Sequence, residues 1–128
     1  MHALSAFDYA VIRVVPRVER GELINAGIIV QCPTQDFLEA QVWLDAERLR
    51  ALWPEVDVND IAEHLSVFPR IAAADLTAGP IASLPRTQRF HWLTAPRSTV
   101  IQTSPVHSGL CVSTAGMVTS LMKRLVLP

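Results

Sequence analysis

The chain lacks the sequence patterns that would support membrane, dithiol or zinc chemistry. Its two cysteines, Cys32 and Cys111, are far apart and form no Cys-x-x-Cys pair, which argues against a redox or zinc motif. No stretch approaches the roughly 18 uninterrupted apolar residues that span a bilayer. The first eight residues contain no basic region followed by an apolar run. We therefore expect a cytoplasmic protein that makes no membrane contact.

Acidic residues are absent after Asp75, and the whole chain has a single lysine. Residues 1–75 contain twelve acidic residues and six arginines, a net charge of about minus six. The remainder contains five cationic residues and no acidic one, a net charge of about plus five. The positive part could dock on the negative part, within the chain or across a dimer, or it could bind an external anion. With one lysine and a pI near 6.4, nucleic acid is an unlikely partner.

No nucleophile, base and orienting group occur at a spacing typical of a catalytic motif. His91, His107 and Cys111 could meet in space, but histidines and thiols at irregular spacing are more often packing or surface residues than metal ligands. We expect no metal and no cofactor. An enzyme also needs a base near its substrate, and the best candidate, Glu22, is surrounded by arginines that would lower its pKa.

The composition predicts one compact domain spanning residues 1–128. Hydrophobic residues make up 50% of the chain, and charged residues make up 18%, below the roughly 25% typical of soluble domains. A domain of this size can bury a core without a disulfide or a metal. The excess of apolar residues predicts a protein partner or a homo-oligomer.

The N-terminal third reads as an antiparallel β-hairpin. Residues Ala10–Val15 and Leu23–Gln31 are rich in Val and Ile, and Pro16 with Gly21 bounds their connection. Alternation places Leu23, Asn25, Gly27 and Ile29 on one face of the second strand, and Tyr9, Val11, Arg13 and Val15 on one face of the first. Gly27 predicts a bulge or a close backbone approach.

Two groups of polar residues are candidate ligand-binding sites. The first surrounds the hairpin turn and contains Arg13, Arg20, Glu22 and Asn25. These residues either lock the hairpin by ion pairs and backbone hydrogen bonds or bind a small anion or a partner's backbone. The second group lies in the acid-free part, where a guanidinium, a hydroxyl and an amide could converge on one oxyanion: Arg97, Ser98 and Gln102.

The remaining patterns complete an α+β fold, a single domain with a small antiparallel sheet covered by about three helices. A third strand is predicted at 36–44, a short strand at 100–103, and an irregular connection at 76–88. Asp45 is placed to cap a helix at 46–53, and Asp57 or Asn59 to start a second helix, which Pro69 kinks or splits. Ser113 or Thr114 is placed to cap a last helix. Because both faces of the hairpin are apolar, we expect helices on one face and a partner or loop on the other.

Three motifs resemble the bacterial family known as domain of unknown function 3037. They are an aromatic residue before an apolar strand followed by Arg13, Pro16 and Arg20-Gly21-Glu22-x-x-Asn25-x-Gly27; Leu49-Arg50-x-Leu52-x-Pro54; and the run from Trp92 to His107 that contains Ala95-Pro96-Arg97-Ser98-Thr99. The family pattern implies an acidic start to the last helix, where this chain has Cys111-Val-Ser113-Thr114. The resemblance implies no assigned activity, and it suggests a HipA-like kinase as a partner, since some members are encoded beside such kinases.

Two function classes follow from these observations. The first is a non-catalytic interaction or regulatory module, which the apolar composition and the absence of catalytic motifs favour. The second is a small enzyme or binding domain for a phosphorylated or anionic ligand, using the hairpin group and the Arg97 segment.

Overall fold

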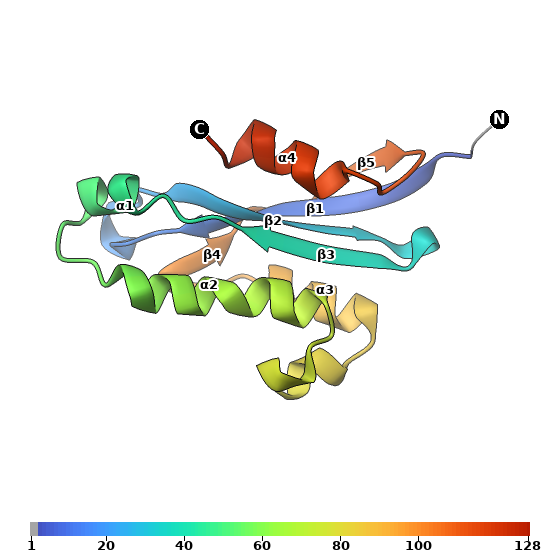
Figure 1. The fold of residues 1–128 in the computed structure, drawn as a ribbon, viewed down its shortest axis with the longest axis horizontal. Helices are drawn as coiled ribbons and strands as arrows, with labels where there is room; N and C mark the ends of the chain where they lie inside the picture. The colour runs from blue at the N-terminus through green and yellow to red at the C-terminus, as the bar shows by residue number, and fades with distance from the viewer. Residues whose placement is uncertain (1–2) are drawn as a thin grey trace.

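The computed structural model describes residues 3–128, which form one antiparallel sheet between two helical layers (Figure 1). Helices α2 and α3 lie below the sheet and α4 lies above it. Within the described residues the strands are β1 (Ser5–Val14), β2 (Ile24–Cys32), β3 (Phe37–Val42), β4 (Ile101–Thr103) and β5 (His107–Cys111). The α-helices are α1 (Ala46–Leu52), α2 (Val58–Ala72), α3 (Arg86–Thr94) and α4 (Met117–Leu125). The predicted α+β class is confirmed.

The sheet is built around the predicted hairpin. Strands β1 and β2 pair antiparallel, and β3 pairs with the other side of β2. The free side of β1 is shared by two short strands: β4 pairs with residues 12–14 and β5 pairs with residues 5–9. The resulting order is β3-β2-β1-β4, with β5 beside β4 along the same edge of β1. The C-terminal part of the chain is thereby joined to its first strand.

Each face of the sheet has its own hydrophobic cluster. On the face covered by α2 and α3, called here the helix-pair face, Ile12, Ile29 and Leu65 are fully or almost fully buried. On the other face, called the α4 face, Val11, Ile28 and Val30 pack with Val118, Leu121, Met122 and Val126. The expectation that a partner or loop would cover the second face is therefore wrong, because α4 covers it.

A β-bulge changes which residues of β2 share a face. Ile12 pairs with Gly27 while Arg13 pairs with Asn25, so Ala26 is the extra residue. Ala26 and Ile29 belong to the helix-pair cluster, whereas Asn25 turns to the α4 face. The predicted shared face of Asn25, Gly27 and Ile29 is therefore wrong. The predicted close approach at Gly27 is confirmed, since a Cβ there would lie 2.6 Å from the backbone oxygen of Gln41.

The first two helices begin where the sequence predicts. Asp45 accepts a hydrogen bond from the Arg48 backbone N–H, and Asp57 accepts one from Asp60, each satisfying a free donor of the first turn. Pro69 lies inside α2, but the helix continues to Ala72 and is not split.

The region after α2 differs most from the sequence-based prediction. Residues predicted as an irregular connection contain two short 3₁₀ turns and the start of α3. Strand β5 was not predicted, because its residues His107–Cys111 are only partly apolar. Helix α4 starts after Gly116 without a side-chain cap, so the predicted capping by Ser113 or Thr114 is wrong. No helix among residues 3–128 is long and apolar enough to cross a membrane.

Candidate functional site

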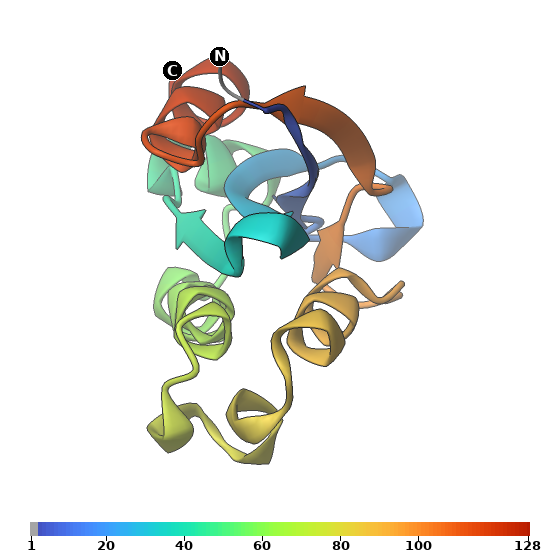
Figure 2. The same ribbon diagram turned by 90° about the vertical axis from the view of Figure 1, so that its right-hand side faces the viewer.

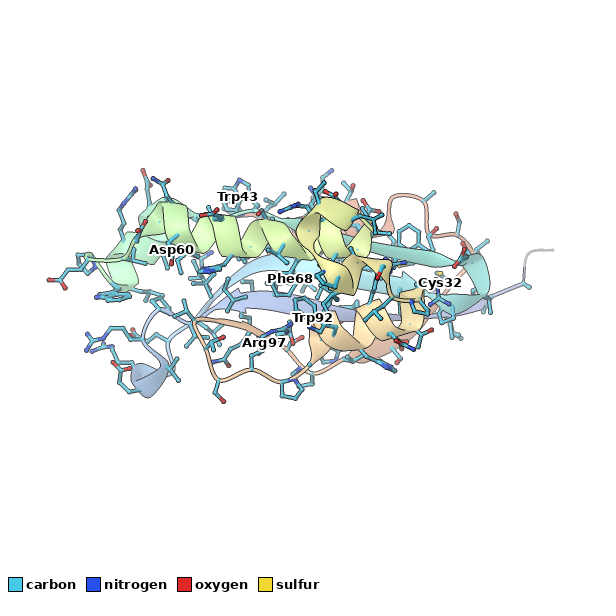
Figure 3. All side chains as sticks on the ribbon, turned by 90° about the horizontal axis from the view of Figure 1, so that it is seen from below. Cys32, Trp43, Asp60, Phe68, Trp92 and Arg97 are labelled. Carbon is cyan, nitrogen blue, oxygen red and sulfur yellow. The ribbon has the colours of Figure 1, made fainter. Side chains whose placement is uncertain are left out.

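A groove with a volume of about 470 Å³ opens between α2 and the segment that runs from α3 to β4. We call it the α2–α3 groove. Most of its wall is aliphatic or aromatic, and it is lined by Asp60, Ile61, His64, Val67, Phe68, Trp92, Arg97, Thr99, Val100 and Ile101. Figure 3 shows Phe68, Trp92 and Arg97 gathered between the two helices. Largely apolar concave surfaces with a few polar groups are typical of binding sites.

The sequence pattern of α2 explains one wall of the groove. Ile61, Leu65 and Phe68 recur at helical spacing and are buried against the sheet. Ile61 and Phe68 also border the groove, with His64 and Val67 on the adjacent flank. The same helix therefore contributes to the core and to the groove wall.

Arg97 closes the second wall through hydrogen bonds to backbone carbonyls. Its Nη1 donates to Leu93 O at 2.9 Å and Ala95 O at 3.1 Å, and its Nη2 donates to Trp92 O at 2.8 Å. These carbonyls lie at the C-terminal end of α3, where a cation also favours the helix dipole. The guanidinium lies 5.0 Å from the Trp92 ring centroid and 5.4 Å from that of Phe68. Burial lowers the pKa of Arg97.

The polar groups at the rim form no catalytic array. His64 Nδ1 lies 3.7 Å from Asp60 Oδ2, and both side chains are more than half exposed. The Thr99 hydroxyl donates to Ile101 O at 3.1 Å. No hydrogen bond joins Thr99 to His64 in the described part of the chain. A nucleophile held by a base is therefore not present at this rim.

A second polar arrangement lies on the α4 face, across three adjacent strands. Asn25, Arg13 and Gln102 are register partners on β2, β1 and β4, and we call them the polar row. Asn25 Nδ2 donates to Leu125 O at 2.9 Å, and Gln102 Nε2 donates to Thr99 O at 2.9 Å. Arg13 forms no hydrogen bond or ion pair among residues 3–128, although its Nε is buried. A buried donor without a partner usually marks a water or ion site, or a strained position.

The other predicted ligand residues lie apart from this row. Arg20 and Glu22 form an exposed ion pair at the hairpin turn. The hydrogen bond from Arg20 to Glu22 raises the pKa of Arg20. Ser98 is exposed in the loop between Arg97 and β4. The structure thus joins Arg13, Asn25 and Gln102 from the two predicted groups, whereas Arg97 is already bonded to α3.

The charge asymmetry has a mostly local role. Arg86 donates to Asp36 at 3.1 Å and to Gln31 at 3.0 Å, which joins the positive and negative parts. Arg89 instead donates to the carbonyls of Ile71 and Ala72 at the end of α2. Cations of the acid-free part therefore satisfy helix carbonyls more than they pair with acids.

The histidines and cysteines do not form a metal-ligand cluster. His91 is on α3, whereas the ring of His107 on β5 is tilted against that of Tyr9, with the centroids 5.2 Å apart. In residues 3–128 no three His, Cys, Asp or Glu side chains come close enough to hold a metal ion. Burial and the neighbouring Cys32 thiol raise the pKa of Cys111, so the thiolate is disfavoured at neutral pH.

Sequence reasoning missed the groove because it missed α3. Phe90 and Leu93, both buried, lie three positions apart after Pro85, a pattern typical of a short helix that begins with proline nearby. This signal was present, but Gly79, Pro80 and Pro85 indicated an irregular connection that extends to residue 88. Trp92 then emerges on the groove side, 37% exposed.

Comparisons with known proteins give one match. The family described as "Protein of unknown function (DUF3037)" matches residues 9–126, nearly the whole chain. No curated protein and no solved structure matches it.

Proposed function

We propose that this chain, which belongs to the DUF3037 family, is a non-catalytic interaction module that binds a protein partner through the α2–α3 groove. The supporting observation is the groove itself, a concave and mostly apolar surface with the partly exposed Trp92 in its wall. Partly exposed tryptophans in such settings often contribute most of an interface's binding energy. Arg97 is already bonded to three backbone carbonyls and lies over the Trp92 and Phe68 rings, which leaves the exposed part of Trp92 and the aliphatic wall of the groove to make the contacts.

The charge around the groove selects the kind of partner segment. Asp60 lines the groove, and Asp57 and Glu63 are exposed nearby in sequence, at the N-cap and in the first half of α2. They would attract lysine or arginine and repel acidic residues. The proposed occupant is therefore a peptide segment of a partner protein, with a leucine- or phenylalanine-sized side chain flanked by basic residues.

Catalysis is the weaker proposal on chemical grounds. Glu22, the base that the sequence offered, is held in an exposed ion pair with Arg20. The exposed His64 has Asp60 beside it but no hydroxyl or thiol bonded to it. A general base must reach a substrate proton within a concave site. The groove offers apolar contact instead.

The family resemblance suggests which protein to test first. A HipA-like kinase encoded in the same genome is the proposed partner, and its surface would need to present the basic and apolar segment described above. Isothermal titration with the purified kinase would measure this interaction directly. Binding to Trp92→Ala as tight as to the unmodified chain would contradict use of the groove.

Defined peptides test the groove without knowledge of the partner. The experiment uses a chain in which Trp92 is the sole tryptophan, made by Trp43→Phe and Trp53→Phe, so that fluorescence reports on the groove. A helical peptide with one central leucine between lysines should shift the Trp92 emission in a saturable way. The same peptide with glutamates, or with alanine in place of leucine, should bind at least about tenfold more weakly.

A surface control separates groove binding from general adhesion. Trp43 is 39% exposed on the chain after β3 and does not line the groove, and Figure 3 shows it on the other side of α2 from Trp92. In the otherwise unmodified chain, Trp43→Ala should leave peptide affinity unchanged in a titration calorimeter, whereas Trp92→Ala should abolish it. Equal losses in the two variants would refute the groove as the binding site.

A second candidate function is the binding of a small oxyanion at the polar row. The observation that favours it is Arg13, a guanidinium without a protein partner on a sheet face where α4 contributes no acid. Saturable movement of the Arg13 Nε–Hε NMR signal with phosphate or acetate would support it. Movement that stays linear and matches that of the exposed Arg20 would contradict it.

A further inference from the structure

Strand β5 has one paired edge and one free edge. Its register runs from Ser5 opposite Cys111 to Tyr9 opposite His107, all against β1. On its other side, no backbone hydrogen bond is formed within residues 3–128. Figures 1 and 2 show β5 at the rim of the sheet, beyond the reach of α2 and α3. A free edge of this kind offers a row of N–H and C=O groups to another strand.

The residues of β5 provide no protection against such pairing. The strand His107–Cys111 contains no lysine, no carboxylate, no proline and no bulge. The opposite edge of the sheet, β3, is different because Glu39 is exposed in its middle. Charged residues on edge strands are a common way to prevent pairing with other chains. Of the two edges, only β3 carries an exposed carboxylate, Glu39, that opposes pairing with another strand.

An apolar patch lies beside the free edge. Ala6 pairs with Leu110, and continuing this register places Leu4 opposite Val112, so these side chains share one face. Leu4 is 61% exposed, Leu110 65% and Val112 50%. None of the three packs against either hydrophobic cluster, so neither α2 and α3 nor α4 covers them. We call Leu4, Leu110 and Val112 the distal patch.

We propose that the occupant of this edge is a second copy of the chain, paired antiparallel β5 to β5 around a two-fold axis. The arrangement joins two five-stranded sheets into one continuous sheet and brings the two distal patches together. Antiparallel pairing of a strand with its own copy is self-complementary, because each residue finds the same partner on both sides.

The chemistry of β5 favours a copy of itself over a charged partner. The strand contains no Asp, Glu, Lys or Arg, so its copy brings no repulsion between such charges to the axis. The same pairing at β3 would place two Glu39 carboxylates near each other. Five paired residues with a small patch bury little area, and interfaces of that size are typically weak and reversible.

Sedimentation velocity on the unmodified chain tests the proposal. Between about 1 and 500 μM, a range that covers weak interfaces, the mass should rise from the 14.1 kDa of one chain toward twice that value. Leu110→Lys should raise the dissociation constant roughly tenfold or more, because it removes an exposed leucine that the pairing would bury and places two cations near the axis. A constant mass of one chain over the whole range would overturn the proposal.

A matched control distinguishes this edge from general stickiness. Leu76 is 70% exposed on a 3₁₀ turn far from β5, so Leu76→Lys should leave the dissociation constant unchanged. In the unmodified chain, hydrogen exchange at β5 amides should slow as concentration rises, whereas β3 amides should not respond. A dimer that survives Leu110→Lys, or that protects β3 instead, would refute the β5 interface. The groove titrations with peptide should be the same for Leu110→Lys, so the two proposals fail independently.

Discussion

On the helix-pair face two arginines are bonded to helix ends, whereas on the α4 face the central arginine of the sheet has no partner. Arg97 and Arg89 donate to the terminal carbonyls of α3 and α2, and these bonds hold the two helices beside the groove. Arg13 lies between Asn25 and Gln102 without a hydrogen bond to either. The comparison shows that one face uses its cations for structure, while the other keeps a cation that structure alone does not explain.

The faces also differ in the size of their cores. The helix-pair cluster draws on three helices, two 3₁₀ turns and four strands, whereas the α4 cluster depends mainly on one amphipathic helix. A single helix on a sheet can shift to fill a small void more easily than a residue enclosed by several elements. We therefore expect the helix-pair face to be the less tolerant of substitution.

The largest difference should come from leucines removed on each face. Leu65→Ala, at a position 1% exposed, should lower the free energy of unfolding by about 3 to 5 kcal/mol, and Leu121→Ala, at a position 7% exposed, by about 2 to 3 kcal/mol. Urea denaturation followed by circular dichroism measures both. If Leu121→Ala proved the more costly, the stated order of the two faces would be reversed.

Two glycines provide a second matched pair. An added Cβ at Gly27 would lie 2.6 Å from the Gln41 backbone oxygen on the helix-pair side, and one at Gly109 would lie 2.8 Å from the Phe7 ring on the α4 side. A ring can rotate away, whereas a paired backbone cannot. Gly27→Ala should cost about 2 to 3 kcal/mol and Gly109→Ala about 1 kcal/mol or less. Thermal melts of the two variants measure these costs. Equal decreases in melting temperature would contradict this distinction between the faces.

The arginines should differ in the sign of their effect. Arg97→Met leaves three helix carbonyls without this donor and should destabilise the chain by about 1 to 2 kcal/mol. Arg13→Met removes a buried donor that has no partner, so stability should stay within about 0.5 kcal/mol or increase. Both free energies come from urea titrations in a buffer without phosphate or carboxylate. A loss above 1 kcal/mol for Arg13→Met would assign Arg13 a structural role.

The smallest effect is expected at the hairpin turn, which belongs to neither face. Glu22→Ala breaks an ion pair whose side chains are 53% and 41% exposed. Solvent screens such pairs, so the change should be at most about 1 kcal/mol and should decrease as salt is added. A larger loss that persists at 1 M salt would indicate that Glu22 supports the sheet in another way.

Local chemistry made much of the fold predictable. The structure confirms three signals that act on neighbouring residues. They are the Val- and Ile-rich runs of β1 and β2, the end of the hairpin connection at Gly21, and the capping carboxylates of Asp45 and Asp57. The close backbone approach at Gly27 was likewise predictable, since a glycine inside a strand often marks close contact with another backbone. The helix at 86–94 was predictable in principle, but the glycine and prolines before it indicated an irregular connection.

The sites depended on contacts between distant residues. The extra residue Ala26 turns Asn25 to the α4 face, and strand pairing brings Gln102 beside Arg13, some ninety positions away in the chain. No local pattern contains this information, because register is set by the packing of whole strands.

The sequence by itself determined the class of fold, the hairpin, two capped helices and the unequal distribution of charge, because those depend on alternation, capping and composition within a few residues. Only the tertiary structure decided that Arg97 binds the end of α3 beside an apolar groove. It likewise decided that Arg13 has no partner and that β5 leaves an uncharged edge open. The physical reason is that partners, burial and free edges are properties of surfaces brought together by folding, which a single stretch of residues does not specify.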